Sequence, residues 1–263
     1  MNVEGKVVLI TGGTNGIGLA VAKILLKHKA KGVSLVDVDE NTTSLDSLSS
    51  QYGNKVLFIK ADVTIHQELE AAFEKTATFF KHLDIVINNA GISNEQDWET
   101  MLNVNLTAVI RGSYLALRKY LPEYKSGEEG TIVNTASILG LQPTQVAPVY
   151  CVCKHGIVSL GRALAGDEFY KKYKVRVVTM CPGLTLSGLH SAPVAVRSVF
   201  PHKISEEMRK MGVKMQEFEA IAEGFLKVIK EGENGSVWVA ENGEPAYEVV
   251  LPEKKDLRKR TYQ

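Results

Sequence analysis

The sequence predicts an α/β protein with a doubly wound, parallel sheet of seven strands, helices on both faces and a single domain. Short runs rich in β-branched residues alternate with helix-length segments along the chain. The runs are hydrophobic almost throughout, which is typical of strands covered on both faces. No linker, low-complexity tract or internal repeat interrupts the alternation. Because strand–helix–strand crossovers are right-handed, their repetition produces a doubly wound sheet.

Seven hydrophobic runs give the expected strands. They are VVLIT (7–11), VSLVD (33–37), VLFIK (56–60), DIVIN (84–88), TIVNT (131–135), VRVVTM (175–180) and SVWVA (236–240). A first helix is expected over Ile17–His28. Between the third and fourth strands a stripe recurs at helical spacing, formed by Leu69, Ala72, Phe73, Thr76 and Phe80. We therefore expect that segment to be a helix packed on the sheet.

The domain is expected to cover residues 1–252, including a substrate loop at 183–213 that interrupts the regular alternation. Residues 253–263 form a charged C-terminal tail, interpreted as a solvated terminus. The loop is either a lid that closes over the substrate or a plain connecting helix, and the sequence favours neither.

Composition argues against several function classes. The 31 Lys and Arg residues nearly balance the 30 Asp and Glu residues, so no net charge favours nucleic acid or an anionic membrane. No run approaches the ~20 apolar residues of a membrane span, and the run Val7–Ile10 is too short for a signal segment. The 3 cysteines predict neither a disulfide framework nor a metal site. We expect a cytoplasmic protein.

A glycine-rich turn joins the first strand to the first helix. The segment TGGTNGIG contains Gly12, Gly16 and Gly18. A pyrophosphate can approach the backbone closely where Cβ atoms are absent, and a helix N-terminus offers free N–H groups. Because the glycines lie between a strand and a helix, they predict a dinucleotide site of the Rossmann type.

Asp37 ends the second strand, 19 residues after Gly18. A carboxylate there accepts hydrogen bonds from the ribose hydroxyls of NAD and repels the 2′-phosphate of NADP, at a cost on the order of several kcal/mol. No Lys or Arg lies between Gly12 and Gly18 or at Val38 to offset that repulsion. The alternative is that Asp37 only caps the next turn, although Asp39 or Asn41 could do so. The predicted cofactor is NAD.

Tyr150 and Lys154 lie four residues apart at the start of an expected helix, and therefore on one face. A nearby ammonium favours the phenolate, which could then remove the proton of an alcohol. Ser137 ends a strand 13 residues before Tyr150, and the carboxyl ends of parallel strands border one crevice. NNAG (88–91) ends the fourth strand, and Asn105 lies in the helix that follows.

Together, TGxxxGIG, NNAG, the serine 13 residues before YxxxK and a later PG (182–183) resemble the short-chain dehydrogenase/reductase family. The resemblance covers essentially the whole chain. Within the family, the sequence is most similar to 15-hydroxyprostaglandin dehydrogenases and insect alcohol dehydrogenases. PVYCVCKHGIV resembles both groups, and NGSVWVAENGEP resembles the insect group.

The resemblance implies hydride transfer between an alcohol and NAD. Tyr150 would be the general base, Lys154 would hold the nicotinamide ribose and lower the Tyr150 pKa, Ser137 would bind the substrate oxygen, and Asn105 would hold a relay water. The implied cofactor contacts are Gly12, Thr14, Asn15, Gly16, Ile17, Gly18, Asp37, Val38, Asp62, Val63, Asn89, Ala90, Gly91, Tyr150, Lys154, Pro182, Gly183, Leu184 and Thr185. The substrate contacts are expected at Ser137, Leu139, Ala147, Tyr150, Leu184 and Leu189. A homodimer or homotetramer is implied by analogy.

The expected substrate is a lipophilic secondary alcohol or the matching ketone, because the surroundings of the reacting centre are mostly apolar. Prostaglandin dehydrogenases carry glutamines just before PVY, whereas this chain has Val146 and Ala147 there, after Gln145. Two other functions stay open: a non-catalytic storage or interaction protein on the same scaffold, and an NADPH-dependent carbonyl reductase, against which Asp37 argues.

Overall fold

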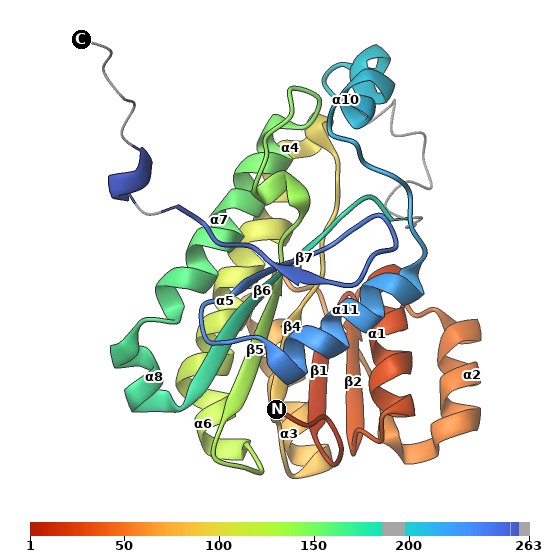
Figure 1. Ribbon diagram of the computed structural model, residues 1–263. Helices are drawn as coiled ribbons and strands as arrows, with labels where there is room; N and C mark the ends of the chain where they lie inside the picture. Colours follow the sequence, from red (N-terminus) through yellow and green to blue (C-terminus); the bar gives the residue numbers. More distant parts are fainter. Residues whose placement is uncertain (186–197, 253, 258–263) are drawn as a thin grey trace.

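One sheet of eight strands organises the computed structural model, which describes residues 1–185, 198–252 and 254–257 (Figure 1). The strands are β1 (Val7–Thr11), β2 (Gly32–Asp37), β3 (Val56–Lys60), β4 (Ile85–Asn88), β5 (Gly130–Thr135), β6 (Val175–Pro182), β7 (Val237–Ala240) and β8 (Tyr247–Glu248). Their order in the sheet is β3-β2-β1-β4-β5-β6-β7-β8, and β1 to β7 are parallel. The predicted doubly wound parallel sheet is confirmed.

The sequence of connections reverses direction between β1 and β4, which are neighbours in the sheet. Val8 of β1 pairs with Val33 of β2 on one side and with Ile85 of β4 on the other. In an open sheet of this kind, the loops leaving the two strands diverge at their carboxyl ends and leave a crevice between them. The site is therefore expected beyond Thr11 and Asn88.

The eighth strand corrects the expectation of seven. Val239 of β7 pairs antiparallel with Tyr247, and Trp238 pairs with Glu248. β8 is two residues long, lies at the edge of the sheet and is exposed. Because neither hydrophobic alternation nor burial develops over two residues, the sequence pattern did not predict it.

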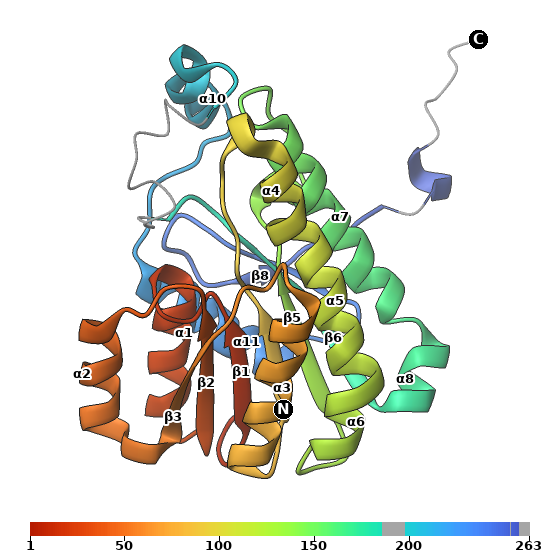
Figure 2. The same ribbon diagram turned by 180° about the vertical axis from the view of Figure 1, so that it is seen from behind.

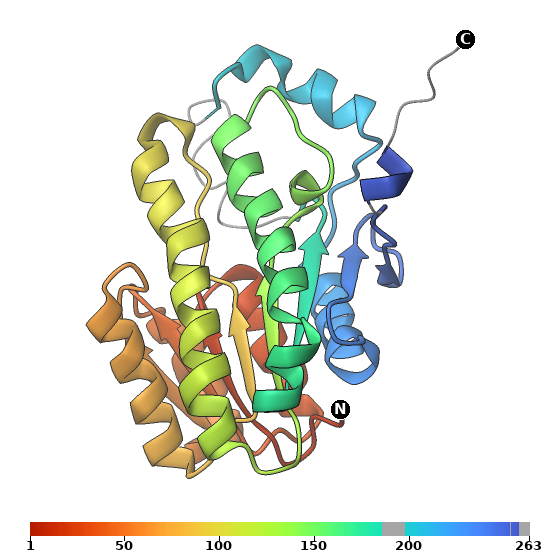
Figure 3. The same ribbon diagram turned by 90° about the vertical axis from the view of Figure 1, so that its left-hand side faces the viewer.

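Helices cover both faces of the sheet (Figures 2 and 3). They are α1 (Gly16–Lys27), α2 (Thr42–Tyr52), α3 (His66–Phe80), α4 (Trp98–Leu102), α5 (Ala108–Leu115), α6 (Leu121–Tyr124), α7 (Pro148–Leu164), α8 (Asp167–Tyr173), α10 (Ile204–Lys210) and α11 (Phe218–Glu231). Two π-helical turns, η3 (Asn103–Thr107) and η4 (Ala116–Tyr120), flank α5. Short 3₁₀ turns are η1 (Gly53–Lys55), η2 (Glu95–Asp97), η5 (Ile138–Gly140), η7 (Pro201–Lys203) and η8 (Lys254–Leu257).

Two large apolar cores lie on opposite faces of the sheet. Leu25 of α1 and Phe225 of α11 belong to one core. Phe73 of α3 and Tyr120 of η4 belong to the other, with their ring centroids 5.1 Å apart. The five-residue stripe predicted in α3 is buried throughout. Both faces of the sheet are therefore covered by packed helices, and the carboxyl ends of its strands are where a site can form.

Some predictions concern residues outside the described ranges. Residues 186–197, 253 and 258–263 are among them. Of the expected tail 253–263 the structure therefore describes only η8, and of the expected loop 183–213 it describes only residues 183–185 and 198–213. The division into a domain at 1–252 and a tail stays a prediction. None of the helices in the described part of the chain is long and apolar enough to cross a membrane.

Candidate active site

A cavity of about 730 Å³ lies beyond the carboxyl ends of the central strands. Its wall comes from the β1–α1 turn, the ends of β2, β5 and β6, the loops at 61–64 and 89–93, the start of α7, and α10. α10 lies above the carboxyl edge of the sheet in Figure 1. The cavity thus joins residues that are far apart in the sequence.

The glycine-rich turn forms one side of the cavity. Gly12 (φ +64°) and Gly16 (φ +52°) have left-handed backbone conformations, and both line the cavity. A Cβ atom on Gly12 would lie 2.9 Å from Cα of Ala90. Gly18 does not line the cavity, and its Cβ would lie 2.1 Å from the Gly12 carbonyl oxygen. Gly18 therefore allows α1 to pack against the turn, while Gly12 and Gly16 leave a bare backbone facing the cavity.

Asp37 is held by the same turn. Thr14 donates to Asp37 Oδ2 from its backbone N (3.2 Å) and from Oγ1 (2.8 Å), and Val38 N donates to Oδ1 (2.9 Å). Thr14 is fully buried and is not part of the cavity wall, whereas Asp37 and Val38 are. The next helix is capped by Asn41, whose Oδ1 accepts from Ser44 N. Capping α2 is thus not the role of Asp37, and its carboxylate is fixed at the edge of the cavity.

The loops after β3 and β4 line the same side of the cavity as the glycine-rich turn and Asp37. Asp62 Oδ1 accepts from Thr64 N (2.8 Å), and Asn89 Nδ2 donates to the carbonyl oxygens of Thr11 and Gly12 (both 3.1 Å). The predicted cofactor contacts on this side that line the cavity are Gly12, Asn15, Gly16, Ile17, Asp37, Val38, Asp62, Val63, Asn89, Ala90 and Gly91. Asn89 therefore ties the β4 loop to the glycine-rich turn.

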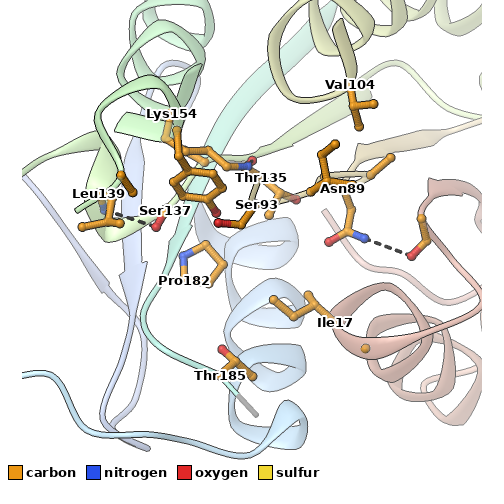
Figure 4. Close-up of a pocket in the computed structure, with 18 of the residues that line it drawn as sticks. Ile17, Asn89, Ser93, Val104, Thr135, Ser137, Leu139, Lys154, Pro182 and Thr185 are labelled. Atoms are coloured by element: carbon orange, nitrogen blue, oxygen red, sulfur yellow. Dashed lines mark hydrogen bonds between the residues drawn. The ribbon is translucent and has the colours of Figure 1, made fainter. Parts of the chain in front are cut away.

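Pro182, Gly183, Leu184 and Thr185 leave the end of β6 and line the cavity beside the reacting centre. Thr185 Oγ1 donates to the Gly183 carbonyl (3.0 Å), and Gln216 N donates to the Leu184 carbonyl (3.1 Å). Figure 4 shows Pro182 near Ser137 and Lys154, with Ile17 and Asn89 across the cavity. Leu189, a predicted substrate contact, lies outside the described residues.

Tyr150 and Lys154 lie one turn apart on α7 and both border the cavity. Lys154 Nζ is 5.4 Å from the centroid of the Tyr150 ring and donates to the Thr135 carbonyl at 2.9 Å. The lysine is almost fully buried. The i, i+4 spacing thus brings phenol and ammonium together, and the end of β5 fixes the ammonium.

The two side chains have pKa values shifted by burial. Burial lowers the pKa of Lys154 to about 8, because a buried ammonium loses hydration. Burial raises the pKa of Tyr150, and a hydrogen bond with Ser137 acts in the opposite direction. The expectation that Lys154 lowers the Tyr150 pKa is therefore not met in this structure. The ammonium is directed to the Thr135 carbonyl, and desolvation of the phenol outweighs the other contributions.

Ser137 follows β5 and borders the cavity beside Tyr150. Its Oγ accepts a hydrogen bond from Leu139 N at 3.2 Å, drawn as a dashed line in Figure 4. Because that bond uses an acceptor site of the oxygen, the hydroxyl hydrogen is left to donate elsewhere. The predicted substrate contacts Leu139, Ala147 and Leu184 also line the cavity.

Asn105 lies behind the cavity wall. Its Oδ1 accepts from Ile92 N (2.8 Å) and its Nδ2 donates to the Ile92 carbonyl (2.7 Å). The side chain is fully buried in the π-helical turn η3 and is not part of the cavity lining. The Oδ1 and Nδ2 atoms of Asn105 therefore both bind the backbone of the loop after β4, next to Gly91.

Several lining residues were not predicted as site residues. They include Ser93, Glu95, Thr135, Thr144, Ile204, Glu207 and Val213. Glu95 accepts from the backbone N–H groups of Val149 and Tyr150, and Glu207 accepts from Thr144 and Gln145. A sequence signal existed for a partner such as Glu95, because Ala147 before Pro148 cannot cap α7 with its side chain.

Comparisons with known proteins agree with this geometry. A family model described as short chain dehydrogenase matches residues 6–195. A 15-hydroxyprostaglandin dehydrogenase [NAD(+)] of Rattus norvegicus is 37% identical over 246 residues, covering 90% of this chain and 91% of the relative. Alcohol dehydrogenase 2 of Ceratitis capitata is 32% identical over 248 residues, covering 92% and 94%. The crystal structure of a 3-ketoacyl-(acyl-carrier-protein) reductase from Brucella melitensis complexed with NADH aligns with a TM-score of 0.72 at 28% identity, covering 92% of this chain and 98% of the other.

Proposed function

This chain belongs to the short-chain dehydrogenase family, and from that premise we propose that it transfers a hydride from a lipophilic secondary alcohol to NAD, with Tyr150 as general base. One observation carries the proposal: Ser137, Tyr150 and Lys154 border the same cavity as Gly12 and Asp37. A dinucleotide that lies along the glycine-rich turn would therefore reach the hydroxyl groups. The relatives named above as an NAD(+) enzyme and as an alcohol dehydrogenase support the same reaction class.

The residues on the cofactor side fit NAD. Gly12 and Gly16 line the cavity without side chains, as the close approach of a pyrophosphate requires, and the first N–H groups of α1 lack intrahelical acceptors. Asp37 lies where the ribose hydroxyls would bind. Lys154 is the one Lys or Arg among the described lining residues, and its ammonium is bonded to the Thr135 carbonyl rather than to Asp37. When bound, NAD supplies the hydride acceptor.

Ser137 and Tyr150 would orient the alcohol and accept its hydroxyl proton. The Ser137 hydroxyl can donate to the alcohol oxygen, and the Tyr150 phenolate can accept the alcohol proton. Because burial raises the pKa of Tyr150, the phenolate is the minor form at neutral pH, and its share grows as the pH rises. The rate of alcohol oxidation, which needs the phenolate, is therefore expected to rise with pH between about 6 and 9, whereas the rate of ketone reduction, which needs the protonated phenol, stays nearly constant.

The substrate side favours a lipophilic alcohol. Apolar side chains from three segments line it: Leu139, Val146, Leu184, Met208 and Met211. Gln145 is exposed and donates to Glu207 (3.0 Å) rather than lining the cavity. The Gln145 side chain is thus not placed to bind a second substrate hydroxyl. This arrangement supports a substrate whose one essential polar group is the reacting hydroxyl.

The test is formation of NADH, followed by absorbance, with a series of secondary alcohols of increasing chain length. We expect kcat/KM to rise with chain length by roughly fourfold per added methylene, since each buried CH₂ contributes about 0.8 kcal/mol. Ser137→Ala should lower kcat by at least tenfold and leave the Kd for NADH unchanged. No NADH with any alcohol, despite NADH binding, would instead support a non-catalytic protein.

Compartment and assembly belong to the same proposal. All three cysteines lie in the described part of the chain and are free thiols, which supports a reducing compartment such as the cytoplasm. Val152 on α7 is 60% exposed, whereas Ile157 on the same helix is fully buried. An outward apolar residue supports burial of this face in a homodimer or homotetramer. Light scattering of the purified chain would measure its mass directly.

A further inference from the structure

The helix that carries Tyr150 begins without a cap of its own. Ala147 precedes it, Pro148 is its first residue, and no side-chain cap bond is formed at Ala147. The next two N–H groups, of Val149 and Tyr150, have no acceptor within the helix, because intrahelical acceptors begin one turn later. Buried N–H groups without partners cost free energy. The start of α7 therefore depends on an acceptor from elsewhere.

Glu95 is that acceptor. Its Oε1 accepts from Tyr150 N at 2.9 Å and its Oε2 accepts from Val149 N at 3.2 Å. Glu95 is 9% exposed and also borders the cavity. A carboxylate at a helix N-terminus is further favoured by the helix dipole. One side chain thus satisfies two backbone groups, one of which belongs to the residue that bears the phenol.

Glu95 is itself held in place. It begins the turn η2, where Asn94 Oδ1 accepts from Gln96 N (3.2 Å). Asp97, at the end of the same turn, caps α4 by accepting from Thr100 N (3.3 Å). The carboxylate therefore projects from a short segment that is fixed on both sides, and its two bonds to α7 fix the helix relative to the loop after β4.

We propose that Glu95 is a positioning residue for Tyr150: it fixes the first turn of α7 and thereby the placement of the phenol relative to Ser137 and Lys154. The proposal rests on the function proposed above. Misplacement of a reacting group by about 1 Å can cost on the order of 100-fold in rate. Glu95 itself need not contact the substrate for this effect.

The opposite end of α7 offers a matched control. Asn234 donates from Nδ2 to the carbonyl of Ala165 (2.7 Å), the residue that caps α7, and its Oδ1 accepts from Val177 N (2.9 Å). Asn234 thus also makes two bonds to the backbone and joins one end of α7 to β6, but it is not part of the cavity. Loss of Asn234 should destabilise the fold without moving Tyr150.

The experiment compares Glu95→Ala, Glu95→Gln and Asn234→Ala in the full chain. Amide hydrogen exchange is measured by mass spectrometry on peptides that cover the start and the end of α7. Turnover of the best alcohol and the Kd for NADH are measured in parallel. Exchange reports the cap whether or not the chain oxidises alcohols, so failure of the proposed function, seen as an inactive wild type, is distinguishable from failure of this proposal.

We expect Glu95→Ala to speed exchange at residues 148–152 by at least tenfold and to lower kcat by about 100-fold, with the Kd for NADH within threefold of wild type. Glu95→Gln keeps one acceptor oxygen, so it should restore much of the protection and lower kcat by about tenfold. Asn234→Ala should speed exchange at the end of α7 and leave kcat within twofold.

Two results would overturn the proposal. Unchanged exchange at residues 148–152 in Glu95→Ala would show that the carboxylate does not hold the first turn. If Glu95→Ala speeds exchange at residues 148–152 but lowers kcat no more than Asn234→Ala does, Glu95 caps the helix without positioning Tyr150.

Discussion

The cofactor side and the substrate side of the cavity are built differently. On the cofactor side, polar groups are fixed by the backbone of the parallel sheet: Asp37 accepts from Thr14, and Asn89 donates to Thr11 and Gly12. On the substrate side, α10 is joined to the loop before α7 mainly through Glu207, which accepts from Thr144 (2.9 Å). The surface that α10 turns to the cavity is apolar, apart from that carboxylate.

This difference separates two kinds of recognition. Hydrogen-bonding groups held rigidly at strand ends can distinguish ligands by the placement of their polar atoms. Apolar side chains distinguish ligands by size and shape, and each methylene contributes about 0.8 kcal/mol. We therefore expect substitutions on the cofactor side to change which dinucleotide binds, and substitutions on the substrate side to change how tightly an alcohol binds. Ser137, Tyr150 and Lys154 border the cavity where the two sides meet.

The largest effect is expected for Tyr150→Phe, at the boundary between the sides. The variant keeps the ring and loses the hydroxyl that would accept the proton, so kcat should fall by about 10³-fold or more. The Kd for NADH, measured by fluorescence, should stay within threefold of wild type. Substantial remaining turnover would show that another group acts as the base.

Asp37→Ala should affect the cofactor side alone. Removal of the carboxylate ends its repulsion of a 2′-phosphate, so the ratio of kcat/KM for NAD to that for NADP should fall by about 100-fold. The KM for the alcohol should not change. Glu40→Ala is the control, because Glu40 is exposed and lies outside the cavity wall. An unchanged ratio would mean that Asp37 does not face the ribose.

Lys154→Met should reveal the cost of a buried ammonium. The pKa of Lys154 is lowered from 10.5 to about 8 in the folded protein. Between those values the unfolded chain binds more protons than the folded one, so this residue makes the stability rise with pH, by about 1.4 kcal/mol per pH unit. Denaturant unfolding at pH 8 and pH 10 should show this rise in wild type relative to Lys154→Met. The exposed Lys23→Met is the control, and a rise that Lys154→Met retains would contradict the assignment.

The smallest effect is expected on the substrate side, for Glu207→Ala. Loss of the bonds from Thr144 and Gln145 should loosen α10, and the KM for the alcohol should rise about tenfold. Affinity for NADH should not change. Glu206→Ala is matched, because Glu206 lies on the same helix but bonds only to Lys203 and Lys210 among the described residues. If Glu206→Ala raised the KM for the alcohol as much as Glu207→Ala does, the bonds from Thr144 and Gln145 would not be what holds the substrate side of the cavity.

Much of the cofactor side could be predicted from the sequence because its signals are local. The turn between β1 and α1 contains its glycines within eight residues, and Asp37 ends a strand whose hydrophobic run is plain. Tyr150 and Lys154 likewise share a helix face by spacing alone. The bounds of β1 and β3 were predicted to the residue, and the other strands of the parallel sheet within two residues.

The parts not predicted depend on contacts between distant segments. The role of Asn105 in holding a water stays a prediction, whereas the bonds of its amide to Ile92 were not predicted, because only the packing of η3 against the β4 loop brings the two residues close. The shift of the Tyr150 pKa was expected downward, whereas burial raises it. Burial and the direction of the Lys154 ammonium are properties of the packed molecule, and no spacing in the chain encodes them.

The sequence by itself determined the doubly wound parallel sheet, the glycine-rich turn and the presence of a phenol–ammonium pair, because each follows from hydrophobic period or from spacing along the chain. The tertiary structure decided how these parts are held. It alone brings Glu95 to the N–H group of Tyr150 and Glu207 to Thr144. The physical reason is that a side chain satisfies a buried polar group wherever the fold places the two together, however far apart they lie in the chain.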